Sequence, residues 1–165
     1  LIGPKKLKNN FQQKDIYEIL KEIYINKFFF VSRGDNSGTH KKELKLWKNL
    51  NLKVDPRKES WFLETGSGMG ASLNVAVNKN AFILTDRATW MSFNNKREHI
   101  IFIEGGKDLY NYYGIIPINP KKCPNVKIKS SEKFINWLLS KEGQELINSF
   151  KKNGKQLFFG NLKEN

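Results

Sequence analysis

The sequence predicts an α/β fold in which a mainly parallel sheet is flanked by helices. Short apolar runs rich in Phe, Ile and Val have the composition of buried strands. The segments between them carry apolar residues at helical spacing. Strands and helices alternate along the chain, as in parallel sheets whose crossover connections are helices. The 165 residues suffice for a domain of ordinary size with a core of its own.

The first elements follow from this pattern. Residues 1–4 are expected to end a strand, because Gly-Pro interrupts regular structure. Residues 15–27 have helical spacing, and the aromatic run 28–31 reads as a buried strand. A polar loop over 32–39 then leads into a helix over 40–50.

In the middle of the chain, Asp55-Pro56 predicts a turn and the start of a new helix. A second Gly-rich loop over 64–70 precedes a helix at 71–79. The apolar run 81–84 is predicted to be a strand, and Asp86 after it is predicted to cap a helix.

The last elements are two strands, two helices and an extended tail. The strands are expected at residues 100–103 and 113–118, and the second of these is a return strand. Ser131 is predicted to cap a helix that runs through Leu139. A final helix is predicted over 142–150, and residues 156–160 are expected to be extended.

Composition limits the classes of function. The net charge of +13 suggests a polyanion as partner, but only four of the 29 basic residues are arginine and the basic residues are scattered. A solvated basic surface is therefore favoured, and nucleic acid is not expected as a partner. No apolar run approaches the length of a spanning helix. Cys123 has no second cysteine with which to pair.

The two Gly-rich loops are the candidate binding elements. Each precedes a helix, whose first N–H groups are unpaired and carry a partial positive charge. In the first loop Ser37, Gly38 and Thr39 can direct N–H and O–H donors at a small oxyanion, and Arg33 adds a forked, charged donor. Two roles stay open for Asp35: it orients Arg33, or it accepts a proton from the ligand.

Other chemistries find less support. Neither loop has the G-x-x-x-x-G-K-S/T pattern of a P-loop, and the chain has no G-x-S-x-G. His40 and His99 with one cysteine do not make a zinc site. Ser37 and His40 are not expected to form a catalytic pair, because neighbours at a helix start rarely face each other. We therefore expect no enzyme, no metal and no cofactor.

Several segments resemble the tungstate-binding proteins of tungstate ABC transporters. The most specific is FVSRGDNSGTHKKE at 30–43, followed by ETGSGMGA at 64–71 and AFILTDRATW at 81–90. YGIIPINP, FINWLLSKEGQ and GKQLFF, later in the chain, match in the same order. The resemblance implies a type II-like periplasmic-binding-protein fold that closes on a tetrahedral oxyanion. It also implies an extracytoplasmic, membrane-associated protein that delivers tungstate or molybdate to an ABC permease.

The resemblance assigns ligand-binding roles residue by residue on the two loops. The residues so assigned are Ser32, Arg33, Ser37, Gly38, Thr39, Thr65, Gly66, Ser67, Gly68 and Met69. A related Arg-x-Asp-x-Ser-Gly-Thr pattern serves phosphate in phosphate-binding relatives. A phosphate-type ligand and an oxyanion-sensing domain of a regulator therefore stay open as alternatives.

The resemblance also implies how the domains are arranged. Residues 1–118 match a second lobe with both hinge strands. Residues 119–165 match C-terminal helices and a tail, which in this family pack on a first lobe. That first lobe has no counterpart in the sequence, so another segment or another chain is expected to supply it.

The protonation of the ligand gives a criterion for its identity. Tungstate and molybdate are fully deprotonated near neutral pH and only accept hydrogen bonds, which suits a pocket of donors alone. Phosphate keeps a proton part of the time and favours a pocket with one acceptor. The orientation of Asp35 therefore decides between the two kinds of anion.

Overall fold

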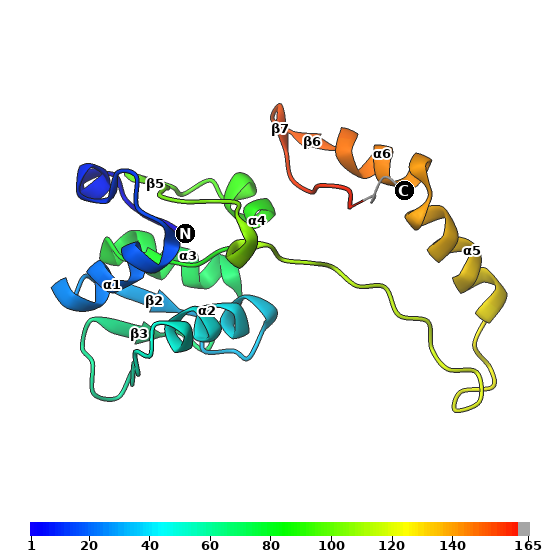
Figure 1. The fold of residues 1–165 in the computed structure, drawn as a ribbon, viewed down its shortest axis with the longest axis horizontal. Coiled ribbons are helices and arrows are strands. Elements are labelled where there is room, and N and C mark those ends of the chain that lie inside the picture. Colours follow the sequence, from blue (N-terminus) through cyan, green and yellow to red (C-terminus); the bar gives the residue numbers. More distant parts are fainter. Residues whose placement is uncertain (162–165) are drawn as a thin grey trace. The chain divides into compact units, whose positions relative to one another are not determined.

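The computed structural model describes residues 1–161 (Figure 1). The chain divides into two units, one of residues Leu1–Tyr110 and one that begins at Asn111. The division falls after Tyr110, earlier than the boundary at residue 118 implied by the resemblance. The first unit contains a five-stranded sheet with helices, and the second contains two helices and a short hairpin. No helix in the described part of the chain is both long and apolar enough to cross a membrane.

The sheet has the strand order β3-β2-β4-β1-β5. The strands are β1 (Ile2–Pro4), β2 (Phe30–Ser32), β3 (Phe62–Glu64), β4 (Phe82–Ile83) and β5 (His99–Ile101). β2 is parallel to β3 and to β4, whereas β1 is antiparallel to β4 and to β5. Four strands therefore run in one direction and β1 runs against them. This confirms the mainly parallel α/β sheet. β3 is a strand that the sequence pattern did not predict.

Four α-helices accompany the sheet, and two short 3₁₀ helices complete the unit. The α-helices are α1 (Ile16–Asn26), α2 (Gly38–Asn49), α3 (Met69–Lys79) and α4 (Arg87–Ser92), and the 3₁₀ helices are η1 (Lys5–Phe11) and η2 (Lys107–Leu109). α1 begins with a capping box, in which Asp15 and Glu18 each accept a backbone N–H of the other. α1, α2 and α3 confirm the three predicted helices, and each of their ends lies within two residues of the predicted end.

The helix predicted to start at Asp55-Pro56 is wrong. The Asp55 carboxylate accepts hydrogen bonds from the Arg57 N–H at 3.0 Å and from the Arg57 guanidinium at 3.1 Å. These local bonds close a turn, and the described residues 55–61 between it and β3 form no helix. Aspartate serves turns and helix caps by the same chemistry, so its presence alone does not separate the two.

Two apolar clusters cover the two faces of the sheet. On one face Phe30 stacks on Phe62, with ring centroids 5.5 Å apart, and packs against Trp47 of α2. On the other face Val31 packs with α3 and α4. Neighbouring residues of β2 thus enter opposite clusters, as expected for a strand that is buried on both faces. Three of the four tryptophans, Trp47, Trp61 and Trp90, are core residues.

The second unit contains α5 (Ile128–Leu139), α6 (Lys141–Ser149) and a hairpin of β6 (Lys151–Lys152) and β7 (Lys155–Gln156). α5 starts three residues before Ser131, so the predicted cap is wrong. The Ser131 hydroxyl instead donates to the Lys127 carbonyl. Ser140 caps α6, and Gly143 lies so close to α5 that a Cβ there would be 2.2 Å from the Trp137 carbonyl oxygen.

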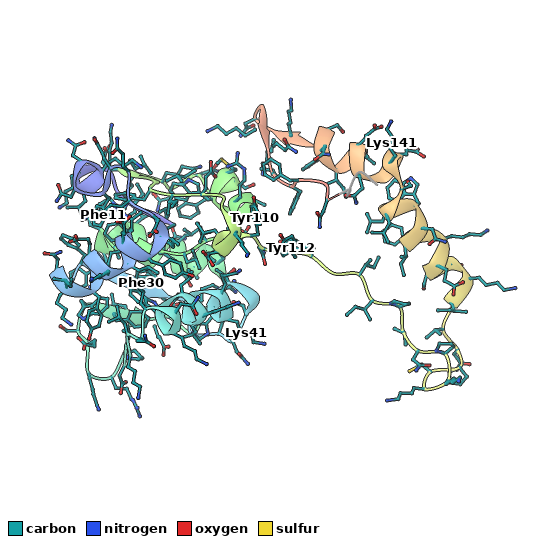
Figure 2. All side chains as sticks on the ribbon, in the orientation of Figure 1. Phe11, Phe30, Lys41, Tyr110, Tyr112 and Lys141 are labelled. Carbon is teal, nitrogen blue, oxygen red and sulfur yellow. The ribbon has the colours of Figure 1, made fainter. Side chains whose placement is uncertain are left out.

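The predicted return strand at 113–118 is not formed in the described residues. Its segment has no regular structure, and Tyr113, Ile116 and Ile118 are exposed. A strand is stable only where a neighbouring strand satisfies its backbone groups, and no strand in the described residues pairs with this segment. Trp137, on α5, is 37% exposed and does not belong to the core. Figure 2 shows side chains of this unit, among them Tyr112 and Lys141.

Candidate oxyanion-binding site

The two Gly-rich loops begin at the carboxyl ends of adjacent parallel strands. Ser32 and Glu64 are partners in the register of β2 and β3, so the loops leave the sheet at the same edge. α2 and α3 begin directly after these loops. Ligands of open α/β sheets bind at this edge, where helix N-termini and loop donors converge.

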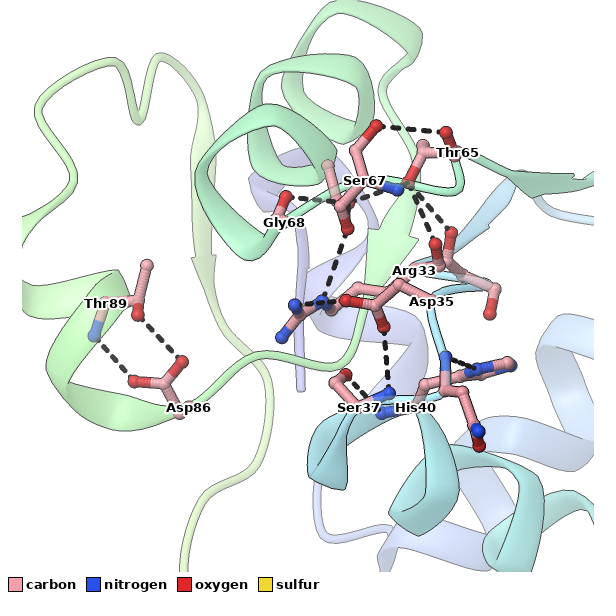
Figure 3. A network of polar contacts seen from close by, with 12 residues as sticks. Arg33, Asp35, Ser37, His40, Thr65, Ser67, Gly68, Asp86 and Thr89 are labelled. Atoms are coloured by element: carbon pink, nitrogen blue, oxygen red, sulfur yellow. Dashed lines mark hydrogen bonds and ion pairs between the residues drawn. The ribbon is translucent and has the colours of Figure 1, made fainter.

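Hydrogen bonds join the two loops to each other (Figure 3). The Arg33 carbonyl accepts from the Ser67 N–H at 3.2 Å and from the Thr65 hydroxyl at 3.3 Å. In return, Arg33 Nε donates to the Ser67 carbonyl at 3.4 Å. Residues assigned separately to the first and second loops therefore form one connected set.

Asp35 is occupied by bonds within the first loop. Its carboxylate forms an ion pair with the Arg33 guanidinium and accepts the Ser37 N–H at 3.2 Å. The Ser37 hydroxyl and N–H, together with Arg33, lower the pKa of Asp35. Asp35 therefore stays ionised and orients Arg33, whose side chain is 16% exposed. This ion pair is the contact that the first of the two roles left open for Asp35, the orientation of Arg33, requires.

The start of α2 carries free backbone donors. The Ser37 hydroxyl accepts the His40 N–H at 3.3 Å and caps the helix. The N–H groups of Gly38 and Thr39 and the Thr39 hydroxyl have no hydrogen-bond partner among the described residues. A helix N-terminus with such donors favours an anion. Gly34, at φ +61°, allows this tight turn, and a Cβ there would lie 3.2 Å from the Glu64 side chain.

The second loop offers fewer side-chain donors than its sequence suggests. The Thr65 hydroxyl bonds to the Arg33 carbonyl and lies 2.8 Å from the Ser72 hydroxyl, and the Ser67 hydroxyl donates to the Thr65 carbonyl. Met69 is buried in the core. Gly66 has a φ of +60°, and Gly68 begins α3 without a side-chain cap. This loop can therefore offer an anion mainly the backbone N–H groups at the start of α3.

Ser32 differs from the other predicted residues because it is completely buried. As the last residue of β2 it lies on the same face as Phe30, two positions earlier. Its hydroxyl lies near Glu43 and has no partner at hydrogen-bond distance in the described structure. In this arrangement Ser32 presents no surface to a ligand.

Glu43 is the polar residue that the sequence analysis missed. It lies on α2, is 2% exposed, and burial raises its pKa to about 8. The nearby Ser32 and Trp47 side chains partly oppose this rise, and the charge of Glu64 adds to it. Its position in the sequence could have indicated its burial. Glu43 lies on the same face of the helix as Leu46 and Trp47, which are core residues.

Two further residues take structural roles. Asp86 caps α4 as predicted, because its carboxylate accepts the Thr89 N–H at 2.8 Å and the Thr89 hydroxyl at 2.7 Å. His40 accepts the Asn36 N–H on Nδ1 at 3.0 Å. Its ring therefore bonds to the loop backbone, while the Ser37 hydroxyl bonds to the His40 backbone (Figure 3).

Comparison with known proteins identifies the family. Residues 1–142 match the model of a PBP superfamily domain. The chain belongs to the PBP superfamily. This membership agrees with the sheet described above and with a binding site at the carboxyl ends of its strands.

Within the PBP superfamily, similar proteins are named for tungstate. The tungstate-binding protein TupA of Campylobacter jejuni is 41% identical over 162 residues, which are 96% of this chain and 60% of the relative. The solved structure of TupA from Desulfovibrio alaskensis G20 is 40% identical with a TM-score of 0.82, over 98% of this chain and 66% of that one. That of the tungstate ABC transporter from Geobacter sulfurreducens is 38% identical with a TM-score of 0.79, over 90% and 62%.

The matches cover a larger share of this chain than of its relatives. This PBP-superfamily chain is matched almost completely, yet it spans only about 60% of the length of the C. jejuni relative. The relatives therefore contain a substantial region to which nothing in these residues corresponds.

Proposed function

We propose that the chain is the oxyanion-binding part of an extracytoplasmic solute-binding protein that supplies tungstate, or molybdate, to an ABC importer. The names of its relatives and the loop geometry support this proposal. No bond is made or broken in such capture, so no catalytic group is required. Arg33, Ser37, Gly38, Thr39, Thr65, Gly66, Ser67, Gly68 and Met69 remain the proposed anion-contacting residues, with Met69 through its backbone.

The observation that carries the proposal is that the Asp35 carboxylate is already bonded to Arg33 and Ser37. Because its carboxylate is paired with Arg33 and Ser37, it is not free to accept a proton from a ligand. The exposed carboxylate of Glu64 lies beside Gly34 at the end of β3. The free groups of the first loop and of the two helix starts are donors: backbone N–H groups, the Thr39 hydroxyl and the rest of the guanidinium. Such a set suits an anion without protons. Charge-assisted bonds of this kind offset the high cost of removing water from a dianion.

Calorimetry with four anions tests the proposal. At pH 7 we expect tungstate and molybdate to bind similarly, because they have nearly the same size and charge. Phosphate, which carries a proton part of the time, should bind at least a hundredfold more weakly. Sulfate is also fully deprotonated but smaller, so it separates the effect of size from that of protonation. Phosphate binding as tight as tungstate binding would contradict the donor-only site.

We propose in addition that a further lobe packs on the second unit. The support is the exposed apolar surface of its two helices, formed by Phe134, Trp137, Leu139 and Leu146. Apolar surface of this extent is typical of a face that is covered in the assembled protein. The relatives are longer than this chain, and the part of them that lies outside the match is long enough to form such a lobe.

A binding experiment with the region of the C. jejuni relative that lies outside the match tests this packing. We expect the chain to form a one-to-one complex with that region in size-exclusion chromatography. Phe134→Asp should abolish the complex, whereas Lys141→Asp, an exposed change on α6, should not. Elution of the chain unchanged by the added region would contradict the proposal.

A further inference from the structure

A buried polar cluster lies behind the first loop, formed by Ser32, Glu43 and Trp47. The three residues are 0%, 2% and 3% exposed. Ser32 Oγ, Glu43 Oε1 and Trp47 Nε1 each have no partner at hydrogen-bond distance in the described residues. Burying polar groups in this way is costly, and packing alone would be served better by an apolar side chain at position 43.

The donors and acceptors of the cluster fit an uncharged carboxylic acid. The Trp47 indole can only donate, and the Ser32 hydroxyl can donate or accept. A neutral Glu43 can accept from the indole through its carbonyl oxygen and donate its own proton to Ser32. An ionised Glu43 would instead place a full charge in the core, close to the charge of Glu64.

We propose that Glu43 is a positioning residue for the anion loop: it acts as an uncharged acid that holds Ser32 at the end of β2, and it must stay uncharged for the anion to be captured. The inference rests on the proposed oxyanion-binding function. Ser32 immediately precedes Arg33, and its carbonyl accepts the Thr65 N–H at 3.1 Å, so it connects the Glu43 cluster to both loops.

Several polar and charged groups surround Glu43. Ser32 faces it from β2, Trp47 from its own helix, and Glu64 acts on it from the end of β3. His40, one turn earlier on α2, is bonded to Asn36 through Nδ1, and its Nε2 is buried without a partner among the described residues. Arg33 and Asp35 neutralise each other in the loop.

Ionisation of Glu43 should oppose binding of a dianion at the loop. A negative charge in the poorly screened interior near the α2 N-terminus repels a second negative charge held at that terminus. By linkage, anion binding must favour the protonated form of Glu43 to the same extent. Affinity for tungstate should therefore fall as the pH rises through the range in which Glu43 loses its proton.

Calorimetric titration of the full chain with tungstate between pH 7 and 9.5 tests this inference. We expect the affinity of the wild type to fall at least tenfold over this range. Glu43→Gln keeps a neutral donor and acceptor, so it should bind within threefold of the wild type at pH 7 and lose at most threefold by pH 9.5. Glu64→Gln removes a charge that raises the pKa of Glu43, so the decline of this variant should begin at a lower pH than that of the wild type. A Glu43→Gln profile parallel to that of the wild type would overturn the inference.

Nuclear magnetic resonance gives a second readout that does not depend on binding. With the side-chain carboxyl carbons labelled, we expect Glu43 in the free chain to titrate near pH 8, and the amide shifts of residues 32–39 to follow the same curve. In Glu43→Gln those amide shifts should be flat. Loop amides that do not follow Glu43 would overturn the inference. Absence of tungstate binding in every variant would instead count against the proposed function and leave this readout decisive for Glu43.

Discussion

Replacing Arg33 by alanine is expected to weaken tungstate binding at least a hundredfold. The guanidinium is the only permanent positive charge in the two loops, and it also bonds to the Ser67 carbonyl that joins them. Hydrogen bonds to charged groups contribute about 1.5–3 kcal/mol each. The substitution also leaves Asp35 unpaired, so that a carboxylate faces the incoming dianion.

The chain supplies a matched control for this experiment. Arg57 forms the same type of pair with an aspartate two residues away, Asp55, but its side chain is 87% exposed and lies in a distant turn. Arg57→Ala removes the same charge and should change the affinity less than twofold. If both variants lost equal affinity, the effect would come from net charge, and Arg33 would have no place in the site.

Arg33→Lys separates charge from geometry. Lysine keeps the positive charge but lacks the planar fork that bonds to Asp35 and Ser67 together. We therefore expect an intermediate affinity for this variant, measured by the same calorimetry.

Much of the fold could be predicted because local chemistry and packing agree. Asp86 was predicted to cap a helix and does so in the structure, whereas the Asp15–Glu18 capping box was not predicted. β3 was missed because its apolar run, Trp61–Leu63, is shorter than the four-residue runs at 28–31, 81–84 and 100–103 that predicted the other strands. A strand of that length is defined by its register with Phe30 to Ser32 of β2, and not by its own composition.

The site was predictable in its backbone and less so in its side chains. Gly, Ser and Thr before a helix indicate where N–H donors converge, and the two loops do meet. Which hydroxyls stay free depends on distant partners: Thr65 is occupied by the Arg33 carbonyl and lies against Ser72. The burial of Ser32 was within reach of sequence reasoning, because residues two apart in a strand share a face, and Phe30 faces the core.

The stability of the first unit should depend on pH through Glu43. The folded chain keeps the Glu43 proton up to about pH 8, whereas the unfolded chain releases it near the ordinary value of 4.5. Between these values the folded state binds more protons than the unfolded state. The free energy of unfolding should therefore fall as pH rises through this window, by up to about 1.4 kcal/mol per pH unit from this group. Below the window and above it, Glu43 should add no slope.

Urea denaturation of Glu43→Gln and the wild type at pH 5, 6.5, 8 and 9 measures this contribution. Both proteins should carry Trp137→Phe, so that fluorescence reports only on Trp47, Trp61 and Trp90 in the first unit. Glutamine has no proton to lose, so the difference in free energy of unfolding between the two proteins should shift steadily in favour of the variant from pH 5 to 8 and then level off. All other titrating groups are shared and cancel in this difference. A difference that stayed constant with pH would mean that Glu43 is already ionised when buried, and the cluster would then be a charged one.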